Sequence, residues 1–204
     1  MAGSWAGSRR AFADAAQWFV QVAGRVGDRW DRAALGEWDV RALVGHTSRA
    51  FLTVEAYLGR PAAVVELGSP VDYYRAAGAI AGGPDVAQRG RDAGTALGPD
   101  PATAVAQIAT RVLALVEDQD GTEPVTTIVG GMLLGDYLPT RTFELAVHTA
   151  DLATALGEPV DVPGTAAAQA LSIAAELAVA RGDAGALLLA LTGRAGLPPG
   201  FSVL

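Results

Sequence analysis

Two histidines and one glutamate are the residues of this sequence best suited to holding a metal ion. The chain has no other histidine and no cysteine, so such an ion would be bound through nitrogen and oxygen alone. Glu144 precedes His148 by four residues, and positions i and i+4 of a helix lie on one face, about 5–6 Å apart between Cβ atoms. His46, on a facing helix, would be the third ligand. Three such ligands leave coordination positions for water or substrate, as in catalytic sites.

Further polar residues continue the face that carries Glu144 and His148. The spacing places Tyr137, Arg141 and Asp151 on the same line, beside a stripe of apolar residues. Asp151 is placed to accept a hydrogen bond from an imidazole N–H, which would fix the tautomer of that ring. Arg141 would hold an anionic substrate, pair with Glu144, or form an ordinary salt bridge on the helix surface. We assign Trp38 to packing rather than to the site.

A plainer interpretation of these residues stays open. Glu-x-x-x-His with a nearby Arg and Asp is common on solvated helix faces, and a single mid-helix histidine such as His46 is often a core residue. From spacing alone, a metal triad and an ordinary helix surface are both compatible with the sequence.

The elements that must position these residues are helices. Apolar residues recur at intervals of three, four or seven almost throughout, which predicts an all-α fold, a four-helix bundle with accessory C-terminal helices, over residues 1–204 as a single domain. The long helices are expected at 5–26, at 40–58, from 101 onward, and from a start between 136 and 139 to 156.

The connecting segments are less regular. We expect a short helix at 71–79, a Gly-rich loop with at most short helical turns at 81–101, a short extended piece at 123–130, and two further helices at 165–180 and 183–192. The apolar faces of the two C-terminal helices would suit a homodimer.

Composition excludes several classes of function. The 22 acidic residues outnumber 15 basic ones, and a net charge of −7 disfavours binding to nucleic acid. No apolar run reaches the roughly 18 residues needed to cross a bilayer, and the first residues lack the apolar stretch of a signal peptide, so a cytoplasmic protein is expected.

Three segments resemble one known family. LGEWDVRALVGHTSRAFLTVEAYLGR (35–60), RTFELAVHTADLATALG (141–157) and the closing LLLALTGRAGLPPGFSVL (187–204) look like the mycothiol-dependent maleylpyruvate isomerase family, in the DinB-like superfamily of metal-binding helical bundles. The resemblance implies a divalent ion, most often zinc, bound by the histidine of a W-x-V-x-x-L-V-x-H motif and by both residues of E-x-x-x-H. These are His46, Glu144 and His148.

The resemblance also implies a low-molecular-weight thiol as cosubstrate, mycothiol in bacteria that make it. The isomerases proper have a second, sterol-carrier-like domain that helps bind the substrate, and this sequence ends soon after the bundle, so activity on maleylpyruvate itself is not expected.

The leading hypothesis is therefore a zinc-dependent transferase or isomerase that activates an external thiol and acts on a small electrophile. One alternative is a non-catalytic, metal-binding or stress-related bundle, and another is a dimerisation module without metal. Nitrogen and oxygen ligands suit zinc, nickel, iron or copper, and the sequence identifies no further catalytic residue.

Overall fold

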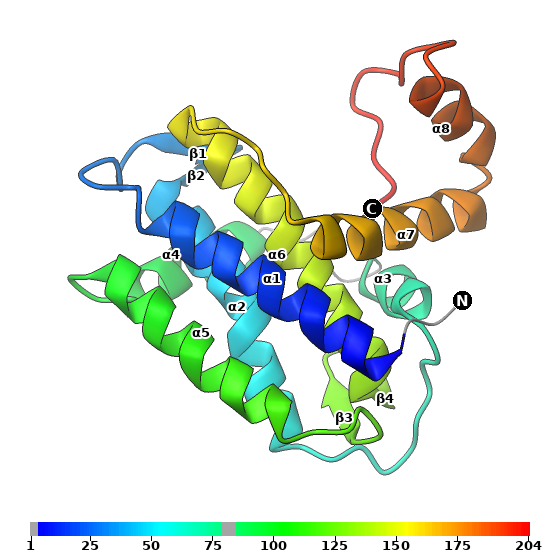
Figure 1. The fold of residues 1–204 in the computed structure, drawn as a ribbon, viewed down its shortest axis with the longest axis horizontal. Coiled ribbons are helices and arrows are strands. Elements are labelled where there is room, and N and C mark those ends of the chain that lie inside the picture. Colours follow the sequence, from blue (N-terminus) through cyan, green and yellow to red (C-terminus); the bar gives the residue numbers. More distant parts are fainter. Residues whose placement is uncertain (1–3, 79–84) are drawn as a thin grey trace.

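Four long helices form the body of the protein. The computed structural model describes residues 4–78 and 85–204, which are mostly helical (Figure 1). The long helices are α1 (Trp5–Ala23), α2 (Val40–Leu58), α5 (Pro101–Glu117) and α6 (Leu134–Leu156). Because α1 and α2 each pack against both α5 and α6, the four enclose one core. The predicted all-α bundle is confirmed.

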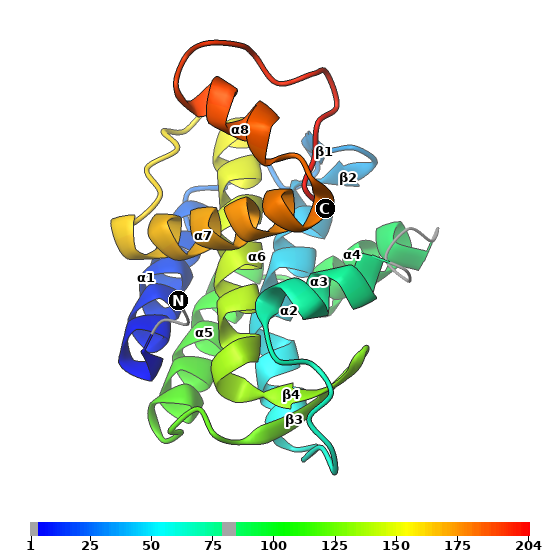
Figure 2. The same cartoon turned by 90° about the vertical axis from the view of Figure 1, so that its right-hand side faces the viewer.

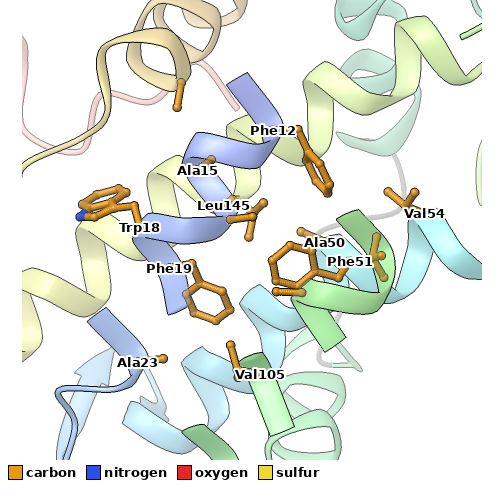
Figure 3. Packing of buried hydrophobic residues seen from close by; sticks show 14 of the residues in the cluster. Phe12, Ala15, Trp18, Phe19, Ala23, Ala50, Phe51, Val54, Val105 and Leu145 are labelled. Carbon is orange, nitrogen blue, oxygen red and sulfur yellow. The ribbon is translucent and has the colours of Figure 1, made fainter. Parts of the chain in front are cut away.

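Aromatic side chains of α1 and α2 fill the centre of this bundle. Phe12 and Phe19 of α1 meet Phe51 of α2, with ring centroids 5.8 Å and 6.1 Å apart, and all three are fully buried (Figure 3). Leu145 of α6 reaches the same core. Burying a phenylalanine side chain stabilises a fold by about 1.5–3 kcal/mol, so these contacts fix α1 and α2 against α6.

The ends of the two helices that carry the candidate site are set by local sequence. At the start of α2, the Asp39 carboxylate caps the helix and accepts a hydrogen bond from the Ala42 N–H at 2.7 Å, as predicted. At the end of α6, Gly157 adopts a left-handed conformation with φ of 73°, which a residue with a side chain rarely adopts.

Two predicted boundaries differ from the structure. The regular part of α1 ends at Ala23, and residues 24–26 form a turn instead of more helix. α6 begins at Leu134, two residues before the predicted range of 136–139. Tertiary contacts explain this earlier start, because the N–H groups of Leu134 and Gly135 donate to the carbonyls of Glu123 and Gly121.

The prediction of a Gly-rich loop at 81–101 is wrong over most of its length. Residues 81–84 lie outside the described residues, but Asp85–Ala96 form a helix, α4, that packs along α2. Its glycines allow a close approach: a Cβ on Gly94 would lie 2.6 Å from the Arg41 carbonyl oxygen, and one on Gly90 would lie 2.7 Å from the Trp38 ring. The packing against α2 therefore outweighs the low helix propensity of glycine.

Two short hairpins flank the bundle. β1 (Ala33–Leu35) pairs with β2 (Trp38–Asp39) directly before α2, and β3 (Pro124–Thr127) pairs with β4 (Gly130–Leu133) directly before α6. The extended piece predicted at 123–130 is confirmed as β3. The other three strands were not predicted, since strands of two to four residues are too short for an alternating pattern.

Besides α4, three further helices of the described residues lie outside the bundle. α3 (Pro70–Gly78) packs on α6 and α7, α7 (Gly164–Arg181) crosses α1 and α6, and α8 (Ala184–Leu191) packs on α7 and projects away from the body (Figure 2). Leu188 and Leu191 of α8 are 63% and 72% exposed, and homodimer formation through these helices stays a prediction. None of the described helices has the length and hydropathy needed to span a membrane.

Candidate metal centre

The polar stripe of α6 lies at the edge of the core from Glu144 to Asp151, as the sequence predicted, whereas Tyr137 and Arg141 are buried. Its apolar neighbours Leu145 and Leu152 are fully buried, while Glu144 and His148 are partly covered and face α2. The Nε2 atom of His148 lies 3.2 Å from Oε2 of Glu144, so one helical turn brings the imidazole and the carboxylate into direct contact.

Asp151 fixes the orientation of the His148 ring. Its Oδ2 atom lies 3.1 Å from Nδ1 of His148, one turn further along α6. With Nδ1–H donating to Asp151, the Nε2 atom of His148 is directed at Glu144 and at the space beside it. This is the arrangement in which a carboxylate sets the tautomer of a metal-binding histidine.

His46 of α2 completes the group. Its ring centroid lies 4.8 Å from that of His148, with the two planes at 85°. One potential ligand atom from each of His46, Glu144 and His148 lies within 4.8 Å of the others. The structure therefore brings together the three residues that the sequence singled out, from helices about a hundred residues apart in the chain.

The charges of this group depend on one another. Burial opposes the charge of Glu144, but the hydrogen bond from His148 and the nearby Arg141 outweigh it and lower the pKa of Glu144 to about 2. Burial likewise disfavours a charged His148, yet its hydrogen bonds to Asp151 and Glu144 raise its pKa to about 9. Burial, then the neighbouring His148, lower the pKa of His46 to about 4. At neutral pH the metal-free site thus holds a carboxylate, an imidazolium and a neutral imidazole.

A divalent ion fits this donor set. The Nδ1 atom of His46 is buried without a hydrogen-bond partner in the described part of the chain, although a buried ring nitrogen normally has one. The 3.2 Å between His148 Nε2 and Glu144 Oε2 matches the roughly 3.3 Å expected for two ligands with bonds of about 2.0–2.1 Å at tetrahedral angles. An ion would replace the proton between those two atoms.

Tyr74 is a contact of the site that the sequence did not reveal. Its hydroxyl lies 2.8 Å from Oε1 of Glu144 and 3.0 Å from the carbonyl oxygen of Thr140. Because the hydroxyl holds Oε1, the other carboxylate oxygen stays directed at His148. Tyr74 lies on α3, and no periodicity connects that short helix with α6.

Trp38 also borders the site, in addition to the packing role that the sequence assigned to it. Its ring lies over the His46 ring at 4.4 Å between centroids, and its Nε1–H donates to the Ala87 carbonyl of α4 at 3.0 Å. α4 therefore supports the ring that covers His46. Trp38 is the first residue of the W-x-V-x-x-L-V-x-H motif, and that position was the sequence signal that it could lie at the site.

Arg141 does not form the surface salt bridge that was one interpretation of its position. Its side chain is buried, with 7% of the residue exposed, and its guanidinium lies over the rings of Tyr137 and Tyr73 at 4.8 Å and 5.2 Å. No ion pair joins it to Glu144 or to any other carboxylate of residues 4–78 and 85–204. The charge of Arg141 still lowers the pKa of Glu144, so these two residues interact without a direct ion pair, and anion binding by Arg141 stays a prediction.

Comparison with known proteins gives one finding. The family model described as the mycothiol maleylpyruvate isomerase N-terminal domain matches residues 10–153, a range that includes all three residues of the candidate centre. No curated protein and no solved structure matches the chain.

Proposed function

Because this chain belongs to the mycothiol maleylpyruvate isomerase N-terminal domain family of the DinB-like superfamily, we propose that it is a metal-dependent enzyme that uses an external low-molecular-weight thiol. The proposed ligands are His46, Glu144 and His148, the proposed metal is zinc, and the proposed cosubstrate is mycothiol. The observation that carries this proposal is the convergence of two imidazoles and one carboxylate from α2 and α6.

The chain's own residues prepare the site for this role. Asp151 accepts a hydrogen bond from Nδ1–H of His148 and directs Nε2 inward, while Tyr74 donates to Oε1 of Glu144 and leaves Oε2 free to bind. Trp38 covers one face of His46 and limits the access of water to that ring. A divalent ion bound there lowers the pKa of a coordinated thiol and supplies the thiolate that a chain without cysteine lacks.

The proposed reaction joins the thiol to a small electrophile, or isomerises a substrate through a reversible thiol adduct. Three protein ligands are the number found in catalytic zinc sites, where further positions admit a thiol or substrate, whereas structural sites use four. This difference favours the enzyme over the non-catalytic metal-binding bundle, which is the second interpretation of the same residues.

Metal content and turnover test the proposal together. We expect about one zinc ion per chain in wild-type protein, and loss of that ion with an unchanged circular dichroism spectrum in His46→Ala and Glu144→Gln. Glu55→Gln is the control, since Glu55 is a carboxylate of α2 paired with Arg111 at the surface. Consumption of 1-chloro-2,4-dinitrobenzene should require both mycothiol and metal.

Two results would change the conclusion. Unfolding of the His46 and Glu144 variants together with metal loss would favour a structural ion. A turnover rate that is the same with and without thiol, for this and other electrophiles, would remove the transferase and leave a metal-binding bundle.

A further inference from the structure

Two facing stripes of polar residues run from the candidate metal centre along α2 and α6. They are in register at two points: the rings of His46 and His148 are 4.8 Å apart between centroids, and the Tyr137 hydroxyl lies 2.8 Å from Oγ1 of Thr53. His46 precedes Thr53 whereas His148 follows Tyr137, so the two helices run antiparallel along this line. Residues between these two points on either helix therefore lie in the stretch of the α2–α6 contact that these two points bound.

Each helix carries an arginine within this stretch. Arg49 is three residues after His46 and Arg141 is three residues before Glu144, so both lie about 5 Å along the helix axes from the metal centre.

The guanidinium of Arg141 is buried but incompletely paired. Its Nε donates to Oγ1 of Thr140 at 2.9 Å, and its flat faces contact Tyr73 and Tyr137. Neither terminal nitrogen has a hydrogen-bond partner among the described residues. Both still reach solvent, since neither is among the unpaired side-chain atoms that are fully buried. The terminal nitrogens of Arg141 are therefore available to donate hydrogen bonds to an anion.

Arg49 shares this lack of partners. It is half-buried, and within residues 4–78 and 85–204 its side chain has neither a hydrogen bond nor an ion pair. The ion pairs of the described residues lie mostly at the surface, as does the pair between Arg111 and Glu55, with N···O at 2.7 Å. The two arginines next to the candidate centre are therefore left without carboxylates in a protein that has an excess of them.

The local charge balance favours an anionic ligand. Glu144 and Asp151 supply two negative charges, which Arg49 and Arg141 offset. A divalent ion that displaces the His148 proton would leave the site with a net positive charge of about two, against −7 for the whole chain. A thiolate sulfur and one further anionic group would neutralise it.

We propose that Arg49 and Arg141 form a binding site for a carboxylate group, one helical turn from the metal centre, and that ligands of this centre carry such a group. A carboxylate matches the planar fork of a guanidinium, which can donate two parallel hydrogen bonds to it. This inference rests on the proposed function for the metal and the thiol, but the carboxylate site itself needs only the two arginines.

Binding of matched acids and amides to the cobalt-loaded protein tests the proposal. 3-Mercaptopropionate and 3-mercaptopropionamide differ only in the carboxylate, and binding of either sulfur produces a charge-transfer absorption band. We expect the acid to bind about ten- to hundredfold more tightly than the amide. Arg49→Gln and Arg141→Lys should each weaken the acid about tenfold and change the amide less than twofold. Arg111→Gln should change neither.

A second pair of ligands separates this proposal from the thiol chemistry. Succinate and succinamide provide the same comparison without sulfur and are followed by calorimetry. If neither thiol produces the band, the proposed thiol function fails. The comparison of succinate and succinamide affinities still tests whether the two arginines bind a carboxylate. Equal affinity for succinate and succinamide in wild type would overturn the inference, as would equal losses of acid and amide in both arginine variants. Should Arg141→Lys fail to fold, the more exposed Arg49→Gln carries the test.

Discussion

Metal binding should release close to one proton per ion over a wide pH range, because the environments of the two histidines separate their pKa values. In the metal-free protein the pKa of His148 is about 9 and that of His46 is about 4, while the pKa of Glu144 is about 2. At pH 5.5 only His148 must lose a proton before an ion binds. Two histidines with ordinary pKa values near 6.5 would together release about 1.8 protons at that pH.

The same values fix how the affinity varies with pH. His148 stays protonated up to about pH 9, so its proton alone should make the affinity for zinc rise about tenfold for each pH unit between 5.5 and 7. For ordinary histidines the release would fall from about 1.8 protons at pH 5.5 to about 0.5 at pH 7. At pH 5.5 a zinc-bound water, whose pKa is about 7, adds little to the count.

Titration calorimetry in two buffers of different ionisation enthalpy measures this proton count directly. Asp151→Asn is an informative variant, because it removes the negative charge that supports the imidazolium and should move the release at pH 7 below one proton. A release near 1.8 protons at pH 5.5 in the wild type would refute the assignment of separated pKa values, and no release at pH 5.5 would refute His148 as a ligand.

Three other predictions follow from named contacts. Tyr74→Phe removes the hydroxyl that holds Oε1 of Glu144 and should weaken zinc binding about tenfold in a chelator competition, while the thermal midpoint of the metal-free protein changes little. Gly94→Ala places a Cβ 2.6 Å from the Arg41 carbonyl oxygen, so denaturant titration should show about 1–3 kcal/mol less stability, and an unchanged midpoint would mean that α4 does not pack as described. In metal-free protein, the raised pKa of His148 contributes stability that is complete below pH 6.5 and is lost as the pH rises through about 9. The free energy of unfolding from denaturant titrations should therefore be lower at pH 9.5 than at pH 6.5 by an amount on the order of 3 kcal/mol, and by less in His148→Gln.

Much of the bundle could be predicted because its signals are local. Asp39 and Gly157 each act within one turn of their own helix, so sequence alone gave the start of α2 and the end of α6. α4 could not be predicted, because Gly90 and Gly94 argue against a helix unless one knows that Trp38 and α2 lie against them. Long-range packing, which a single sequence does not show, decides such segments.

In the candidate site, too, contacts within one helix could be predicted from the sequence, and contacts between helices could not. The contact between Glu144 and His148, and that between His148 and Asp151, follow from spacings of four and three on one helix. Tyr74 reaches Glu144 from 70 residues away, and the burial of Arg141 depends on the tyrosines of α3. The spacing left Arg141 with three interpretations because burial of a helix face is set by whichever element covers it.

Anomalous diffraction at the zinc absorption edge, from crystals grown with zinc, tests the central claim most directly. The account predicts one strong peak within about 2.0–2.2 Å of a nitrogen of His46, a carboxylate oxygen of Glu144 and Nε2 of His148. A peak bound elsewhere, or none at these three residues when the crystals hold zinc, would contradict it.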